Sequence, residues 1–505
     1  MNKKKVIIIG GGTAGLTIAN HLQEYFDVIV IEKSKYLKYP IIYKIPLMIG
    51  LIFRNIKTKY LFERQFVLSD GRQIPFYESN VLGGASIING CVHMLGNKLH
   101  WKSILKYFNV TYEELLESYG KIFSSNRNTK NRINLTSAHQ NIIDEAFLET
   151  LNQYNIPAGD MNVSDKEACG PILNTVRKYF RSSVLSLINK KKFRVVTGEI
   201  VEEILFDDNS KVTGIKTDLS SINSDYVIMS GGVIGTCGLL LRAKHKNEKD
   251  ENNILKDLVI GTEIQDHTNL RINVIANKNI GSLNEIYYSF FRKLLLILRH
   301  FIGKSTLMTG TGATSAAHLD LDKDGVIDTR IQIVQLTESG RHGSDGKYFS
   351  TRKPGFSISI TTMNPESKGE IIVEGLNTTV SPKYLSSKND VELLKSALKY
   401  CLKLLQSEPL SDHILEIEDE YTMEHDPEKY IFNNIFSGAH LIGGSHNAIN
   451  SSFEVDNTKG LYVCDASVFN EYAASNIHSS VVLIADIFSK KFVVNNFEPN
   501  TQSVG

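Results

Sequence analysis

A run of glycines near the start of the chain has the spacing of a nucleotide-binding loop. Residues 10–15 read Gly-Gly-Gly-Thr-Ala-Gly, the pattern G-x-G-x-x-G. In this pattern Gly10 permits a tight turn, Gly12 lets the backbone approach a pyrophosphate, and Gly15 lets a helix pack closely on a strand. Amide groups at the start of that helix, around Thr13 and Ala14, would then receive the phosphates. The loop therefore predicts a dinucleotide-binding site.

The glycine loop needs a strand before it and a helix after it, and the sequence provides both. Residues 3–9 pass from lysines into a β-branched run, which is typical of a buried parallel strand, and residues 16–22 have helical apolar spacing. A second expected strand, residues 27–31, ends at Glu32, about 20 residues after the loop, where a carboxylate would bind an adenosine ribose. An acid favours a ribose without a phosphate, a feature that FAD and NAD share. This motif alone leaves both cofactors open.

The composition is that of an ordinary globular protein. The chain has 505 residues, of which 42% are hydrophobic and 22% charged, so we expect several domain-sized units rather than a disordered or fibrous chain. With 56 basic and 55 acidic residues the net charge is +1, and no overall field attracts the protein to nucleic acid or to an anionic membrane. Five cysteines without a C-x-x-C pair favour a reducing compartment over a disulfide framework or a zinc site. No stretch reaches the ~20 apolar residues of a membrane span, so we expect a cytoplasmic protein.

A second glycine-containing segment makes a resemblance to a known family specific. Residues 81–90 read Val-Leu-Gly-Gly-Ala-Ser-Ile-Ile-Asn-Gly, which suits neither a core nor a helix and predicts a bound or tightly turned backbone. The segment resembles V-L-G-G-S-S-x-x-N-G of the glucose–methanol–choline (GMC) oxidoreductases, flavoenzymes that oxidise alcohols. It departs from that pattern at Ala85, usually a serine, and at Leu95, where an arginine often precedes the glycine. Ile88 lies about where members with a histidine-linked flavin carry that histidine, so the resemblance implies non-covalent FAD.

The resemblance continues in order along nearly the whole chain. Residues 193–201 are similar to a strand that ends on an adenine contact, and residues 226–234 are similar to a strand and turn that approach FAD again. Residues 261–267 resemble the motif G-x-x-L-Q-D-H, with isoleucine for leucine, and residues 365–369 resemble a P-x-S-x-G turn. The FAD-binding residues implied by the resemblance are Gly10, Gly12, Thr13, Ala14, Gly15, Glu32, Gly83, Gly84, Ser86, Asn89, Gly90, Val201, Asp465 and Ala466.

The C-terminal part resembles the family's catalytic segments. Residues 440–445 resemble H-x-x-G-[GT]-C, with serine in place of cysteine, and residues 460–469 resemble the strand and turn that meet the flavin. Residues 476–480 align with N-P-x-x-[ST], with Ile477 in place of the proline. The resemblance therefore implies that His440 is the active-site histidine and that Asn476 is its partner.

These two residue types suit the removal of hydride from an alcohol. An imidazole, with an ordinary pKa of ~6.5, can take the hydroxyl proton, and the carboxamide of Asn476 can donate a hydrogen bond to the oxygen as negative charge builds. Three other interpretations stay open. The sole role of Asn476 could be to cap a helix. His478 could compete as the catalytic group, although at a helix start it should point away from Asn476. His267, in the D-H motif, is expected to be structural.

Two further segments have residue patterns that are typical of other functions. Residues 320–328 place aspartates as a calcium loop does, but the twelfth position is Ile331 rather than glutamate, so we interpret the segment as a hairpin turn and expect no metal site. Residues 287–299 form an apolar helix with basic residues, which could touch a membrane surface. The family has a helix at this point, so we expect a packed helix or a cavity wall, and no membrane contact.

The resemblance implies an α/β protein, α+β overall, with two domains. Residues 1–267 and 446–505 would form a Rossmann-like, doubly wound FAD-binding domain, with helical parts near residues 100–180 on the substrate side. Residues 268–445 would mainly form a substrate domain on an antiparallel sheet. The implied activity is oxidation of the CH–OH group of a small alcohol to an aldehyde or ketone, with either oxygen or a quinone as electron acceptor. A lyase that keeps FAD for structure and an inactive FAD-binding scaffold are the alternatives.

Overall fold

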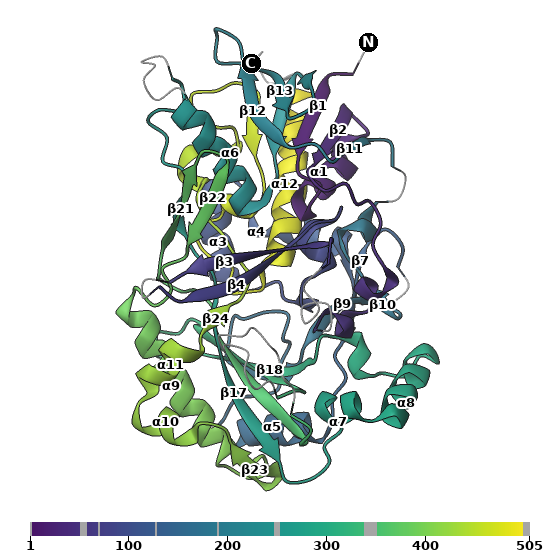
Figure 1. Ribbon diagram of the computed structural model, residues 1–505, viewed down its shortest axis with the longest axis vertical. Coiled ribbons are helices and arrows are strands. Elements are labelled where there is room, and N and C mark those ends of the chain that lie inside the picture. The colour runs from purple at the N-terminus through teal and green to yellow at the C-terminus, as the bar shows by residue number, and fades with distance from the viewer. Residues whose placement is uncertain are drawn as a thin grey trace.

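Two sheets organise the protein. The computed structural model describes residues 3–50, 58–68, 71–126, 129–188, 191–246, 253–337 and 351–497. A parallel sheet lies in the upper part of Figure 1 and an antiparallel sheet in the lower part. Each sheet collects strands from segments that are far apart in the sequence. The expected combination of a parallel and an antiparallel sheet is therefore present.

The parallel sheet has five strands in the order β11-β2-β1-β15-β25, and all neighbours pair in parallel. Val6, Ile7 and Ile8 are fully buried, because helices cover both faces of such a sheet and its strands are apolar on both sides. The two expected strands around the glycine loop are confirmed. The strands of the sheet are β1 (Lys5–Ile9), β2 (Asp27–Glu32), β11 (Arg194–Thr197), β15 (Tyr226–Met229) and β25 (Leu461–Val463).

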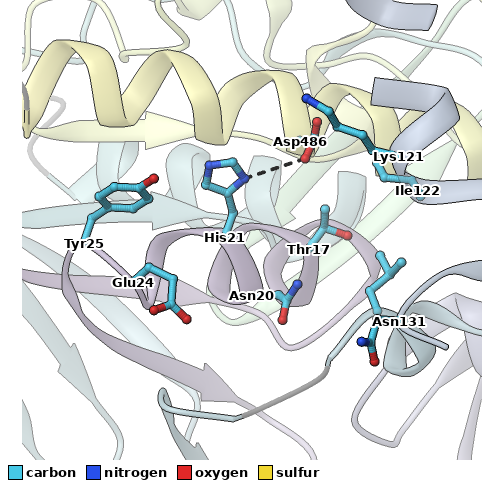
Figure 2. Close-up of a pocket in the computed structure, with 10 residues that line it drawn as sticks. Thr17, Asn20, His21, Glu24, Tyr25, Lys121, Ile122, Asn131 and Asp486 are labelled. Carbon is cyan, nitrogen blue, oxygen red and sulfur yellow. Dashed lines mark ion pairs between the residues drawn. The ribbon is translucent and has the colours of Figure 1, made fainter. Parts of the chain in front are cut away.

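Helix α1 (Thr13–Leu22) follows β1 directly, as expected, and packs along the C-terminal helix α12 (Ile477–Asn496), which is yellow in Figure 1. A pocket lies beside these two helices, and Figure 2 shows the ion pair in it between His21 Nδ1 and Asp486 Oδ1, 3.7 Å apart. Asp486 is about 14 Å along α12 from Ile477. This pocket is therefore separate from the site that forms at the N-terminus of α12.

The antiparallel sheet has seven strands, in the order β23-β17-β20-β19-β18-β8 with β24 also pairing with β17. Strand β20 alternates Phe356, Ile358 and Ile360 with small polar residues, so one face of the sheet is apolar and the other polar. Helices α5 (Ile142–Gln153) and α9 (Lys388–Leu405) contact this sheet. The strands are β8 (Ala168–Pro171), β17 (Thr268–Ala276), β18 (Ala313–Leu319), β19 (Thr329–Val334), β20 (Gly355–Thr362), β23 (Ile414–Ile417) and β24 (Phe436–Ser437).

The other elements are smaller sheets and surface helices. The additional strands are β3 (Leu61–Val67), β4 (Gln73–Ser79), β5 (Val92–His93), β6 (Phe123–Ser124), β7 (Ile133–Ser137), β9 (Leu173–Arg177), β10 (Phe180–Arg181), β12 (Val201–Phe206), β13 (Val212–Thr217), β14 (Ser221–Asn223), β16 (Thr262–Ile264), β21 (Gly369–Glu374) and β22 (Asn377–Ser381). The additional α-helices are α3 (Lys98–Tyr107), α4 (Tyr112–Ile122), α6 (Gly232–Lys246), α7 (Leu283–Tyr288), α8 (Phe290–Phe301), α10 (Glu420–His425) and α11 (Pro427–Asn434). The 3-10 helices are η1 (Ile41–Lys44), η2 (Pro46–Met48), η3 (Gly84–Ile87), η4 (Val184–Leu187), η5 (Leu307–Thr309), η6 (Ser411–His413), η7 (His446–Ala448) and η8 (Ala466–Val468).

The aspartate-rich segment that imitates a calcium loop is a hairpin connection, as expected. It joins β18 to β19, which pair in antiparallel register. The Asp328 carboxylate accepts hydrogen bonds from the backbone of Leu321 at 2.8 Å and of Asp322 at 3.0 Å. The carboxylates of Asp320, Asp322 and Asp328 lie within 4.8 Å of one another. Asp328 therefore serves to close the turn.

Helix α8 differs from our expectation. We expected a packed helix or a cavity wall, but Phe290 and Phe291 are 71% and 80% exposed, and His300 is the one buried residue of the helix. The expectation was wrong because an apolar pattern predicts a helix and its apolar face, but not whether another element covers that face. Among the described residues, no helix is long and apolar enough to cross a membrane.

Candidate active site

The first glycine loop has the close contacts that its motif requires. Gly10 has φ +105°, and a Cβ on it would lie 2.4 Å from the carbonyl oxygen of Ser230. A Cβ on Gly15 would lie 2.0 Å from the carbonyl oxygen of Gly10. At Gly12, by contrast, an added Cβ would meet nothing within 4 Å. The loop is thus held tightly by its outer glycines and leaves open space at the central one.

The second glycine loop packs directly on the first. The backbone N–H of Gly83 donates to the carbonyl oxygen of Gly11 at 2.8 Å, and a Cβ on Gly84 would lie only 2.8 Å from Gly12 Cα. Helix α1 begins next to this contact, with Thr13 and Ala14 in its first turn. No side chain caps it, and its first turn has no acidic residue. Its free N–H groups and the open space at Gly12 fit a pyrophosphate.

Glu32 lies at the end of β2, where the sequence predicted a ribose-binding acid. Its side chain is buried, with Oε2 accepting from Gly11 N and Oε1 from Ser34 N, both at 2.8 Å. Burial raises its pKa above the ordinary value, against the effect of these two hydrogen bonds. Each oxygen keeps a lone pair that can accept from a ribose hydroxyl. The segment that leads to Val201 leaves the sheet beside Glu32, since Gly198 N donates to Glu32 O at 2.9 Å.

The polar groups of the second loop mostly form hydrogen bonds within the protein. The buried Ser86 hydroxyl donates to Gly83 O at 2.7 Å, and Gly90 O accepts from Thr311 Oγ1 at 3.0 Å. Asn89 is held by Arg181, whose Nη1 donates to both the side-chain oxygen and the carbonyl oxygen of Asn89. These residues shape the loop, and the backbone is left to contact a ligand.

Asp465 joins two strand ends of the parallel sheet. It follows β25 and precedes η8, which begins at the half-buried Ala466. One carboxylate oxygen accepts from Gly232 N at 2.9 Å, at the start of α6, and the other accepts from Ser467 N at 2.8 Å. Burial raises the pKa of Asp465, although these hydrogen bonds oppose the shift. Asp465 therefore anchors the C-terminal edge of the sheet, the edge where such folds bind ligands.

His440 and Asn476, which sequence reasoning paired, are in contact. His440 follows β24, and Asn476 is the N-cap residue of α12. The distance between His440 Nε2 and Asn476 Nδ2 is 3.2 Å. The Asn476 side chain makes no capping hydrogen bond, which argues against the alternative that it only caps the helix.

His267 contacts His440 from the other side, and sequence reasoning had treated it as structural. The Nδ1 atoms of the two rings are 2.9 Å apart, and His267 Nε2 is 3.1 Å from the carbonyl oxygen of Met363. A carbonyl can only accept, so His267 carries its proton on Nε2 and accepts on Nδ1. His440 must then donate from Nδ1, which leaves the lone pair of His440 on Nε2, facing Asn476. No sequence signal beyond the D-H motif pointed to this role.

Two neighbours, Tyr472 and Asp266, hold the two histidines in place. Tyr472 stacks on the His267 ring, with centroids 3.9 Å apart, and its hydroxyl donates to the carbonyl oxygen of His440 at 2.9 Å. The buried Asp266 accepts from His440 N at 2.7 Å and also from the hydroxyls of Tyr384 and Ser437. Burial raises the pKa of Asp266 to about 6, against these hydrogen bonds.

The site keeps its histidines neutral. Burial, and then the positive charge of Arg330, lower the pKa of His440 to about 3. Burial, and then His440 itself, hold the pKa of His267 well below its usual range. Arg330 Nη1 donates to Asn476 Oδ1, so the amide group of Asn476 faces His440 with its N–H. Arg330 is a site residue that sequence reasoning missed, and no motif marks it.

His478 is the competitor that the sequence left open. The residue as a whole is half-buried, but both ring nitrogens are buried, and neither has a hydrogen-bond partner in the part of the chain that the structure describes. Burial, followed by the charge of Arg181, lowers its pKa to about 4. His478 thus stands apart from the hydrogen-bonded chain that includes His440.

Most of the chain matches known proteins. Two family models, both described as GMC oxidoreductase, match residues 4–269 and 365–485. Glucose dehydrogenase (FAD, quinone) of Drosophila pseudoobscura pseudoobscura is 23% identical, over 95% of this chain and 85% of its own length. The oxygen-dependent choline dehydrogenase of Vibrio vulnificus is 24% identical, over 95% of this chain and 92% of its own.

Solved structures share the fold. The pyridoxine 4-oxidase of Mesorbium loti superposes with a TM-score of 0.79 at 17% identity, covering 97% of this chain and 99% of its own. A formate oxidase superposes with a TM-score of 0.84 at 15% identity, covering 98% of this chain and 99% of its own. The expected fold class, a Rossmann-like FAD-binding part joined to an antiparallel sheet, is confirmed.

We predict that Gly84→Ala weakens FAD binding by about tenfold or more, because a side chain at positive φ costs about 1–3 kcal/mol and its Cβ would press on Gly12. The measurement is FAD titration of the apoprotein, with circular dichroism to verify folding. Gly235→Ala is the matched control, since an added Cβ there meets nothing within 4 Å. Equal FAD affinity in both variants would contradict the role given to the contact between the two loops.

Proposed function

Because the chain belongs to the GMC oxidoreductase family, FAD-dependent enzymes that oxidise alcohols, we propose that His440 and Asn476 form its catalytic pair. The FAD cofactor and the alcohol oxidoreductase activity expected from the sequence are confirmed by this membership. The reaction converts a CH–OH group to an aldehyde or ketone. The observation that carries the assignment of the pair is the 3.2 Å contact between His440 Nε2 and Asn476 Nδ2.

His440 acts as the base. Its Nε2 carries the lone pair, because the ring is neutral and its other nitrogen donates to His267, and this lone pair accepts from Asn476 Nδ2 at 3.2 Å. A substrate hydroxyl beside the pair would donate its proton to this lone pair. His267 is then a positioning residue, since its bond to the Met363 carbonyl decides which nitrogen of His440 is free.

Asn476 supplies the donor that stabilises charge. Its Nδ2 lies 3.2 Å from His440 Nε2, so a substrate oxygen bound beside the pair would accept from Nδ2 as negative charge builds. The hydrogen bond from Arg330 to Oδ1 keeps the amide in this orientation. The buried guanidinium also draws electron density toward Oδ1, which makes the N–H of the carboxamide a stronger donor.

The two glycine loops, the uncapped start of α1 and Glu32 would hold the cofactor. FAD, when bound, accepts the hydride that leaves the alcohol carbon. The open point is the acceptor that regenerates it: the names of the relatives include both a quinone and oxygen, and both stay candidates here. A cytoplasmic location also stays a prediction; the five cysteines are buried and free, which fits a reducing compartment.

We predict that His440→Ala slows alcohol-dependent bleaching of the flavin absorbance, under anaerobic conditions, by roughly a hundredfold to ten-thousandfold. FAD content should not change, because His440 lies outside the glycine loops. The control is His425→Ala, an exposed histidine on α10. Unchanged bleaching would remove His440 from the mechanism. If no alcohol bleaches the flavin of the wild-type protein, the lyase or the scaffold is favoured.

The low pKa of His440 also predicts the pH dependence of the reaction. Since the pKa is lowered to about 3, the neutral, active form is complete at any pH well above that value and is lost only as the pH falls through it. The rate of flavin bleaching at saturating alcohol should therefore be flat across the neutral range and show no limb near pH 6.5. Stopped-flow measurements test this, with circular dichroism to verify folding at each pH. Because Asp266 has a pKa of about 6 and holds His440, Asp266→Asn is measured beside the wild type, and an acid limb near the ordinary histidine pKa that persists in this variant would contradict the assigned environment.

A further inference from the structure

Arg330 is a buried cation on the polar face of the antiparallel sheet. On β19, Arg330 lies opposite Thr361 of β20 on one side and His318 of β18 on the other. Asn269 of β17 lies opposite Thr361 and continues this row of polar residues. Only 4% of Arg330 is exposed. Its two contacts both come from Nη1, which meets Asn476 Oδ1 and lies 2.8 Å from Met94 Sδ. The guanidinium therefore lies next to the catalytic amide.

No carboxylate in the described part of the chain neutralises Arg330. Nε is buried without a hydrogen-bond partner among the described residues, and the guanidinium forms none of the ion pairs found there. The carboxylate nearest in the hydrogen-bonded chain, Asp266, is occupied by Tyr384, Ser437 and the backbone of His440. Arg330 stays positively charged at neutral pH, because burial lowers its pKa only to about 10.

The surrounding titratable groups are basic but neutral. The pKa values of His318 and His440 are both lowered to about 3, first by burial and then by Arg330. A buried charge without a counter-ion is unfavourable, so an anion that enters the site gains by pairing with it. Because Nη1 is in use, the Nε–Nη2 edge remains, and that edge of a guanidinium matches the two oxygens of a carboxylate.

We propose that Arg330 binds an anionic carboxylate of the substrate, so that the preferred substrates are alcohols that carry a carboxylate. The inference rests on the proposed function of His440 and Asn476. The reaction itself is unchanged: the hydride passes to FAD, the hydroxyl proton to His440, and the carboxylate is not altered. A cationic alcohol such as choline, named in one of the relatives, would be repelled by Arg330.

The binding test uses probes that cannot be oxidised. Benzoate and acetate, with benzamide and acetamide as neutral matches, are titrated into the holoenzyme while the flavin spectrum is recorded. We expect the carboxylates to bind about tenfold tighter or more than the amides. Arg330→Met should abolish this difference, Arg330→Lys should keep part of it, and Arg194→Met, which removes an exposed arginine on β11, should leave it unchanged.

The activity test compares 4-(hydroxymethyl)benzoate with 4-(hydroxymethyl)benzamide. Arg330→Met should lower the ratio of their kcat/KM values by about tenfold or more, whatever it does to both rates through Asn476. An unchanged ratio overturns the proposal, because Arg330 then acts only through Asn476. Bleaching by neutral alcohols alone would overturn the carboxylate preference and leave the proposed function standing. If carboxylates bind in an Arg330-dependent way but no alcohol bleaches the flavin, the proposed function is overturned and the carboxylate site stands.

A second, independent observation concerns helix α8. Eight large apolar residues in and just after this helix are exposed, and they recur at spacings of one, three and four residues, which place them on one face. They are Phe290, Phe291, Leu294, Leu295, Ile297, Leu298, Phe301 and Ile302. In Figure 1 the helix stands out from the body of the lower half. An apolar face of this extent marks an interaction surface.

The opposite side of α8 attaches it to the protein. His300 is buried, with Nε2 3.1 Å from Tyr179 O and Nδ1 3.1 Å from Thr306 Oγ1. The rings of Tyr179 and Phe301 are 5.5 Å apart. The helix is thus anchored near its C-terminal end by His300 and Phe301, while the other seven apolar residues stay exposed.

Positive charge borders the apolar face. Lys293, Arg299 and Lys304 are exposed, and Lys178, next to Tyr179 in the β9–β10 turn, adds another exposed cation. The only acidic residue between residues 279 and 306 is Glu285, and it is paired with Arg292. We infer that α8 lies on the surface of a membrane that contains anionic lipids, with its apolar face in the acyl boundary and its cations at the headgroups. This differs from our expectation of no membrane contact, which rested on the family having a helix at this point that would be packed or line a cavity.

The test is co-sedimentation of the holoenzyme with lipid vesicles. We expect binding to phosphatidylcholine vesicles that contain phosphatidylglycerol, weaker binding to phosphatidylcholine alone, and partial release at high salt. The double substitution F290S and F291S should weaken binding by about tenfold or more, whereas Leu376→Ser, at an equally exposed apolar residue in the β21–β22 turn, should not. No vesicle binding overturns the inference. A dimer in solution that F290S and F291S dissociate would also overturn it, because a second copy would then cover the face.

Discussion

The hydrogen bond from His267 to the Met363 carbonyl sets the proton positions in the whole site. Because a carbonyl cannot donate, it fixes the tautomer of His267, which fixes the tautomer of His440, which turns a lone pair toward Asn476. Arg330 fixes the chain from its other end, through the oxygen of Asn476. A neutral base in a defined tautomer therefore results from backbone geometry at one end and a permanent charge at the other.

The parts that local sequence determines could be predicted. Gly10, Gly15 and Glu32 lie where the loop motif places them, because a strand, a tight turn and a helix form from contiguous residues. His440 and Asn476 are in contact although they are 36 residues apart, and the sequence could suggest the pair because a family motif marks each of them; their catalytic role stays a prediction.

The roles that depend on distant contacts could not be predicted. His267 and His440 are 173 residues apart, and only the pairing of strands brings them together. Arg330 is one polar residue in an alternating strand, and nothing in its neighbourhood distinguishes it from a surface arginine. The face of α8 was predicted to be apolar, but its exposure depends on what the rest of the chain leaves uncovered.

Helix α12 has one further consequence for the enzyme. Its first turn follows Asn476, and its length packs along α1, the helix whose start fits the cofactor phosphates. The side-chain amide of Asn476, which we propose to meet the substrate, and the backbone amides suited to the cofactor therefore lie on one pair of packed helices. The spacing between the two sites is then set by how α1 packs on α12 within the core.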